Sequence, residues 1–158
     1  YGVKGLYALR NFAILDEKNE YLVKANSYWF LLNTETGRPM RIMESDTAPY
    51  GEFSPKLEME DAGRKIQVPK EMEETGRMVV MKHLLDTNLH VNNAQYVDIA
   101  RELLPAGTEI SEIRAEYRKA AVLGDEIVIR SAREGKSYLV SLCNPDGDVF
   151  ANIELKEM

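Results

Sequence analysis

The second half of the chain alternates apolar and polar residues in a pattern that predicts an antiparallel sheet. In the last such stretch, "DVFANIELKE", Val149, Ala151, Ile153 and Leu155 alternate with polar side chains, which is typical of a strand with one buried face. Three similar stretches precede it: "EISEIRAEYRKAAV", "DEIVIRSARE" and "KSYLVSLCN". The turn sequences "LGD", "EGK" and "PDGD" separate the four. The pattern therefore predicts four consecutive antiparallel strands.

A helical period replaces this alternation just before the four strands. Tyr96, Val97, Ala100 and Leu104 recur at the spacing of one helix face in "NAQYVDIARELL", and "PAG" ends the helix. The stretch before the helix, "GRMVVMKHLLD", reads as a strand. A curved sheet wrapped around this helix would bury all the apolar faces. We therefore predict an α+β domain over residues 76–158, in which these four helix residues face the sheet.

The first part of the chain predicts strands without a helix. "GLYALRNFAILD" and "YLVKANSYWFLLN" read as two strands joined by the polar turn "DEKNE", and "TETGRPMRI" adds a turn and a short third strand. Such a sheet is marginal in water unless something covers its apolar face. Residues 44–75 contain three prolines, many charges and weak periodicity, so we interpret them as a linker with a short helical turn. The strands before this linker occupy residues 1–43.

Composition and charge narrow the function classes. The 158 residues are enough for one domain with a core, or for one domain and part of another. A net charge of -6 argues against a general nucleic-acid binder, and no apolar run approaches the roughly 18 residues of a membrane helix. The single cysteine, Cys143, excludes an internal disulfide, and with only two histidines we expect no metal site. The expected compartment is the reducing cytoplasm.

The stretch "DTNLHVNNAQYV", immediately before the predicted helix, is unusually rich in hydrogen-bonding side chains. Asn92 or Asn93 is a natural N-cap for the helix. Capping does not account for Asp86, Asn88 and His90, which alternation through "DTNLH" would place on one side of the chain. An acid, an amide and an imidazole beside a helix N-terminus suit hydrolysis. Asn- and Asp-rich loops also precede helices without any catalytic role, so the spacing alone leaves both interpretations open.

The same stretch resembles the D-x-N-x-H-V-N-N motif of the acyl-acyl carrier protein thioesterases, the plant and bacterial enzymes that end fatty acid synthesis. "LRNFAILDEKNEYLVKANSYWFLLNTETGRPMRI" resembles the end of the family's N-terminal domain, and "EIRAEYRKAAVLGDEI" is similar to the strand after its catalytic helix. The resemblance implies two hotdog domains in tandem, each a helix wrapped by an antiparallel sheet. Residues 1–43 would then be the last strands of an incomplete first hotdog, and residues 76–158 the complete second one.

The resemblance also implies a reaction, a partner and a set of site residues. The reaction would be hydrolysis of the thioester of an acyl carrier protein (ACP) to free fatty acid and carrier, with acyl-ACP as partner and without a cofactor. Asp86, Asn88 and His90 would be catalytic, and backbone amides near Asn92 and Asn93 would hold the thioester carbonyl. Asp86 and His90 both stay candidates for the general base. Hotdog units usually pair, which also allows for a homodimer.

The chain departs from the plant members of the family at one point. There a Glu-Cys pair follows the E-Y-[RK]-[RK] sequence, whereas this chain has Ala120 and Ala121. A cysteine nucleophile is therefore excluded at that position. Hydrolysis by water needs only one base, so we expect Asp86 and His90 to suffice. The alternative is that Glu116, expected on the same strand face, replaces the missing carboxylate.

Three other functions compete with this one. The first is a hotdog thioesterase acting on acyl-CoA, which differs in carrier preference. The second is a hotdog dehydratase or hydratase, against which the linker and the D-x-N-x-H spacing argue. The third is a protein that binds acyl groups or their carrier without catalysis, which the alanine at position 120 keeps open.

Overall fold

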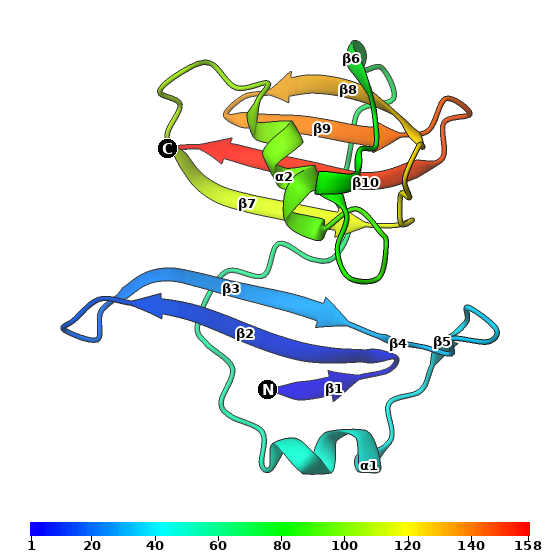
Figure 1. Cartoon of the computed structure of the whole chain (residues 1–158). Helices are drawn as coiled ribbons and strands as arrows, with labels where there is room; N and C mark the ends of the chain where they lie inside the picture. Colours follow the sequence, from blue (N-terminus) through cyan, green and yellow to red (C-terminus); the bar gives the residue numbers. More distant parts are fainter. The chain divides into compact units, whose positions relative to one another are not determined.

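The computed structural model describes all 158 residues and divides them into two compact units, residues 1–62 and residues 63–158 (Figure 1). The boundary between the units falls inside the segment expected to be a linker, residues 44–75. Residues 63–75 therefore belong to the second unit. Neither helix of the chain has the length and apolar composition that crossing a bilayer requires.

The second unit is a five-stranded antiparallel sheet packed on one helix, α2 (Asn93–Arg101) (Figure 1). The sheet order is β6-β8-β9-β10-β7, so the strands before and after the helix form the two edges. The strands are β6 (Glu73–Val79), β7 (Ile110–Tyr117), β8 (Glu126–Glu134), β9 (Ser137–Cys143) and β10 (Val149–Glu157). This arrangement confirms the predicted α+β hotdog fold.

The core of the second unit lies between α2 and the face of the sheet that it covers, here called the inner face. Tyr96 and Ala100 are buried, and Val97 and Leu104 pack against the core, as the helical spacing predicts. The sheet contributes Ile127, Val140, Leu142, Ile153 and Leu155. Burial of one such large side chain stabilises the fold by roughly 1.5–3 kcal/mol. The helix ends at Arg101 rather than at Leu104, because the proline at position 105 disfavours helical geometry in the residue before it.

The segment before the helix differs from the predicted single strand. β6 begins at Glu73 and ends at Val79, and a 3-10 helix, η2 (Lys82–Leu84), follows. Val80 leaves the β6–β8 pairing and instead exchanges backbone hydrogen bonds with Gly124 and Asp125, at 3.0 and 2.8 Å. Val80 is nearly completely buried, so the chain turns into the core at this point. The turn directs the following loop toward the start of α2.

The opposite, outer face of the sheet is covered in its centre. Asn152 and Ser141, paired across β10 and β9, are both buried there. The prediction that the last strand is buried on one face only is therefore wrong for its centre. The reason is that the chain before β6 crosses this face, with Ile66 buried against it.

Two charged side chains hold this crossing segment. The backbone N–H of Ile66 donates to the Glu116 carboxylate at 3.1 Å. Arg114 donates to the carbonyl of Lys65 at 3.1 Å, and its guanidinium also pairs with Glu154 at 2.6 Å. Both anchors come from β7, the edge strand, so the segment lies across the outer face at that edge.

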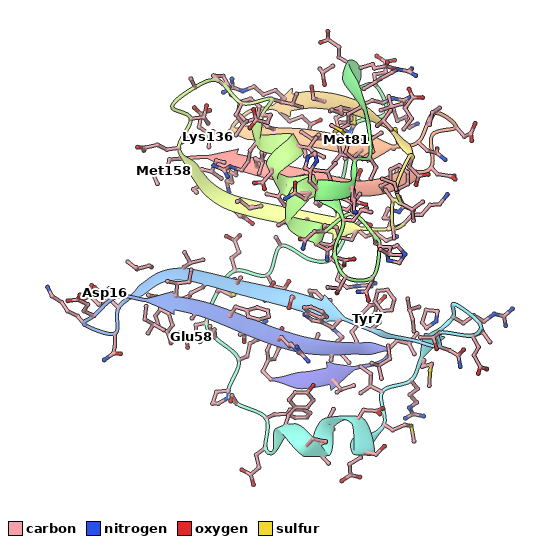
Figure 2. All side chains as sticks on the ribbon, in the orientation of Figure 1. Tyr7, Asp16, Glu58, Met81, Lys136 and Met158 are labelled. Carbon is pink, nitrogen blue, oxygen red and sulfur yellow. The ribbon has the colours of Figure 1, made fainter.

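The first unit contains two small antiparallel sheets (Figure 1). Three strands pair in the order β1-β2-β3, and Asp16 lies at the turn between β2 and β3 (Figure 2). They are β1 (Gly2–Lys4), β2 (Tyr7–Leu15) and β3 (Tyr21–Trp29). The two long strands were predicted, whereas β1 was not. The predicted third strand does not join this sheet: β5 (Pro39–Met40) pairs only with β4 (Leu31–Leu32). The predicted helical turn is α1 (Glu44–Thr47) with the 3-10 helix η1 (Ala48–Tyr50).

One face of the three-stranded sheet carries exposed apolar side chains. Phe12 pairs with Ala25 and Ile14 with Val23 on this face, and Ile14 is 58% exposed. On the other face, Asn11 accepts a hydrogen bond from the backbone N–H of Leu57 at 2.9 Å, so the chain after η1 covers it. The sequence on this apolar face alternates as in a strand packed against a core, but its apolar side chains are exposed.

We predict that this chain associates with itself through the exposed apolar face. Large apolar surfaces left in water favour association. Replacing Phe12 and Ile14 by lysine should shift the chain toward monomer, as measured by sedimentation velocity over a range of concentrations. A concentration-independent monomer of the unaltered chain would contradict the prediction.

Candidate functional site

Residues 86–90 form a tight hairpin loop and not the extended segment that alternation predicted. The N–H of Asp86 donates to the carbonyl of His90 at 2.7 Å, and the N–H of Leu89 donates to the carbonyl of Asp86 at 3.1 Å. The flanking residues Leu85 and Val91 form an antiparallel bridge. These bonds define a β-turn over residues 86–89, whose last residue, Leu89, has the left-handed conformation. The turn, and not strand alternation, brings Asp86 and His90 together.

The Asp86 carboxylate holds this loop from inside. Its Oδ1 accepts hydrogen bonds from the backbone N–H groups of His90 at 3.2 Å and Asn88 at 2.8 Å. The bond from His90, more than that from Asn88, holds the pKa of Asp86 below its ordinary value, against a smaller effect of desolvation. A carboxylate with a lowered pKa is a weaker base. Asp86 therefore stays ionised and fixes the backbone of the two residues whose side chains are exposed.

The start of α2 has backbone N–H groups that helix geometry leaves without partners within the helix. Asn92 is the N-cap, since its Oδ1 accepts from the N–H of Ala94 at 2.9 Å and its carbonyl accepts from Gln95. This assigns the predicted capping role to Asn92 and leaves Asn93 as the first helical residue. The first turn contains no acidic side chain, so the partial positive charge of the helix end is not neutralised there. Such an end can stabilise a developing oxyanion.

Two tyrosine hydroxyls attach this helix start to the sheet. The hydroxyl of Tyr96 accepts from the backbone N–H of Ala121 at 3.0 Å in the core, and the hydroxyl of Tyr117 donates to the carbonyl of Asn93 at 3.1 Å. The two rings lie 6.0 Å apart. Burial raises the pKa of both hydroxyls, so both stay protonated near neutral pH. The sequence analysis missed these contacts, although a tyrosine on the apolar face of a helix signals that its hydroxyl needs a partner.

The two alanines at the Glu-Cys positions lie next to the loop. His90 forms an antiparallel bridge with Val122, and the N–H of Val91 donates to the carbonyl of Ala121 at 2.9 Å. Ala121 is completely buried and Ala120 is exposed. Continued antiparallel register would place position 120 opposite Asn92, two residues from His90. In this protein neither position supplies a nucleophile or a base.

Glu116 lies on the face of the sheet that is away from α2. Tyr117 reaches α2 on the inner face, and neighbouring residues of a strand point to opposite faces. Glu116 accordingly lies on the outer face, where its carboxylate accepts from Ile66. Glu116 thus lies on the side of the sheet away from α2, and its replacement of the missing carboxylate stays an untested alternative. Of the predicted site residues, the structure brings together Asp86, Asn88, His90, Asn92 and Asn93, all within one loop and the first residue of one helix.

The sheet wrapped around one helix, with a polar loop at the helix start, defines the second unit as a hotdog domain. The family model described as the acyl-ACP thioesterase C-terminal domain matches residues 67–155, and the model for the N-terminal domain of the same enzymes matches residues 1–50. The chain belongs to the acyl-ACP thioesterase family.

Solved structures share this fold at low sequence identity. An acyl-ACP thioesterase from Bacteroides thetaiotaomicron is 19% identical with a TM-score of 0.82, covering 99% of this chain and 65% of that one. The 12:0-ACP thioesterase from Umbellularia californica is 23% identical with a TM-score of 0.84, covering 99% of this chain and 65% of that one. This chain thus spans slightly under two thirds of the length of each. A comparison with curated protein sequences gave no match.

Replacing Tyr96 by phenylalanine should destabilise the second unit. The variant leaves the buried N–H of Ala121 without an acceptor, which costs about 1–3 kcal/mol of unfolding free energy. The matched control is Tyr117→Phe, whose lost hydrogen bond lies nearer solvent and should cost about 0.5–1.5 kcal/mol. Urea unfolding measures both. Equal stability of Tyr96→Phe and the unaltered protein would contradict this account of the helix attachment.

The contribution of Asp86 to stability should depend on pH in a defined direction. Because its pKa is lower in the folded than in the unfolded chain, its ionisation stabilises the fold above about pH 4, and this contribution is lost as the pH falls through the folded pKa. Asp86→Asn removes the ionisation at every pH. The urea midpoint of the unaltered protein should exceed that of Asp86→Asn at neutral pH, and the gap should shrink in acid. A gap independent of pH would show that the charge of Asp86 has no part in holding the loop.

Proposed function

We propose that this chain carries the catalytic residues of an acyl-ACP thioesterase, which hydrolyses the thioester of a fatty acyl group on ACP to free fatty acid and carrier. The main support for the proposal is the pattern of hydrogen bonds and exposed side chains in the motif. The Asp86 carboxylate accepts hydrogen bonds from the loop backbone, whereas the side chains of Asn88 and His90 are exposed. They directly precede a helix end whose first turn has no acidic side chain to neutralise its partial positive charge. Membership of the family supports the same reaction.

In the proposed mechanism His90 is the general base. It takes a proton from water as the water oxygen attacks the thioester carbonyl carbon, and the carbonyl electron pair moves onto oxygen. The N–H of Asn93 and the helix end stabilise this oxyanion. When the carbonyl re-forms, the carbon–sulfur bond breaks, and the sulfur leaves as a thiol with the proton held by His90. Asn88, which both donates and accepts hydrogen bonds, positions the water or the carbonyl.

Asp86 is a positioning residue in this mechanism. Its lowered pKa and its two backbone contacts suit a constant negative charge better than proton transfer. These two features support His90, of the two candidates that the sequence left open, as the proposed base. Acyl-ACP is the proposed partner, fatty acid biosynthesis in the cytoplasm is the proposed setting, and a homodimer stays a prediction.

The test follows free-thiol release from ACP and CoA thioesters of the same acyl groups by the full-length protein. His90→Ala should lower kcat by about 10²–10⁴ fold, the usual contribution of a general base. Asp86→Asn keeps the Oδ1 acceptor and should lose less activity than His90→Ala. If Asp86→Asn abolishes turnover and His90→Ala does not, the base is Asp86.

Glu116→Gln is the matched control for the carboxylate question. Its amide oxygen can still accept from Ile66, so the variant should keep both stability and turnover. Preference for the ACP thioester supports the proposed partner, and equal rates on CoA thioesters would favour the acyl-CoA alternative. An enoyl product would mark a dehydratase, and binding of acyl-ACP without thiol release would mark a non-catalytic binder.

A further inference from the structure

The chain builds one kind of hairpin loop three times. The loops are residues 16–20, 86–90 and 144–148, and the first lies at the turn marked by Asp16 in Figure 2. In each, the N–H of the first residue donates to the carbonyl of the fifth, at 3.0, 2.7 and 2.9 Å. The N–H of the fourth residue donates to the carbonyl of the first, at 3.1, 3.1 and 3.0 Å.

The side chain of the first residue also has the same role in all three loops. Its Oδ1 accepts from the backbone N–H of the fifth residue, at 2.8 Å for Asp16, 3.2 Å for Asp86 and 2.7 Å for Asn144. The loops of Asp16 and Asn144 join strands outside the motif. The internal bonding of Asp86 is therefore that of an ordinary hairpin loop, and the exceptional feature of the motif loop must lie elsewhere.

The exception is the fourth residue. This position is left-handed in every loop, with φ of 64° at Asn19, 62° at Leu89 and 92° at Gly147. Glycine and asparagine adopt this conformation readily, whereas a leucine Cβ crowds the backbone there. The motif loop thus has a strained residue where its two counterparts have tolerant ones. Residues held in strained backbone cluster at functional sites.

Burial does not compensate for the strain at Leu89. Its side chain is 70% exposed, so packing within the chain cannot explain the choice of leucine. The next residue, His90, pairs with Val122, which is also exposed, and Leu123 beyond it is 59% exposed. Exposed apolar side chains therefore flank His90 on its own strand and on the paired segment.

We propose that Leu89 is a substrate-contacting residue, which together with Val122 receives the alkyl chain of the acyl group next to the reacting carbonyl. The inference rests on the proposed function, whose substrate joins a methylene chain to the thioester. Leu89 and Val122 carry no hydrogen-bonding group in their side chains, so they match alkyl carbon and not a charged or polar ligand. Burial on substrate binding provides the stabilisation that the free loop lacks.

The experiment compares Leu89→Gly and Leu89→Asn with the unaltered full-length protein on ACP thioesters of increasing acyl length. Both variants fit the left-handed position, so their melting temperatures should equal or exceed that of the unaltered protein. Their kcat/KM for long acyl chains should fall by roughly tenfold, and the loss should shrink as the acyl chain shortens. Leu89→Met, which restores an apolar side chain, should recover most of the loss. Asn19→Gly, the same change in the counterpart loop, should leave kcat/KM unaltered.

Three outcomes would overturn the proposal. Unaltered kcat/KM in Leu89→Gly at every acyl length would show that the leucine contacts no substrate. A loss equal for all acyl lengths would assign the contact to the carrier's thiol arm, the other source of apolar carbon. A lower melting temperature of Leu89→Gly would mean that the leucine packs within the protein.

A binding titration separates this proposal from the proposed function. The probe is an alkyl thioether analogue of acyl-ACP, which cannot be hydrolysed. If the unaltered protein releases no thiol but binds the analogue, and Leu89→Gly binds it roughly tenfold more weakly, the contact holds while the hydrolytic function fails. If both proteins bind it equally, the contact is absent whether or not thiol is released.

Discussion

The hydrogen bond between the buried hydroxyl of Tyr96 and the backbone N–H of Ala121 connects the core of the second unit to its candidate site. Tyr96 lies on the face of α2 that the sheet encloses, so packing fixes its ring. Its hydroxyl then fixes the segment that pairs with His90 and Val91. The apolar core thereby determines the position of the polar loop. Tyr117, on the edge strand β7, adds a second attachment, because its hydroxyl donates to the carbonyl of Asn93 at the start of α2.

Within the motif, some residues hold the backbone in place and their neighbours present exposed polar side chains. Asp86 and Asn92 use their side chains to satisfy backbone N–H groups. The side chains of Asn88, His90 and Asn93 are exposed beside them. A loop that bonds its own backbone can present reactive groups without large rearrangement, which favours catalysis by positioning. The strained residue inside this rigid loop is the one feature that loop stability does not explain.

Much of the fold could be predicted from the sequence, because the spacing of apolar residues follows the strand period or the helix period closely in the second unit. Alternation located β8, β9 and β10, and the helical spacing identified the buried face of α2. Asn92 was one of the two residues predicted as the N-cap. Prediction failed where tertiary contacts override local pattern. "DTNLH" reads as alternating, but the bonds of Asp86 fold it into a turn. The centre of β10 is buried on both faces because residues far away in sequence cross its outer side. The contact of Glu116 with the chain before β6 could likewise not be read from its own strand, because Ile66 lies 50 residues away in sequence.

The central claim is that the loop before α2 carries the chemistry without a carboxylate at position 120. The most direct measurement is the rate of thiol release from one acyl-ACP by the unaltered full-length protein and by Ala120→Glu, which restores the acid found in plant members of the family. Because Ala120 is exposed, the substitution should fold normally. The account predicts that the unaltered protein is active and that the two rates agree within about tenfold. An unaltered protein without activity, and an Ala120→Glu variant that gains it, would contradict the account.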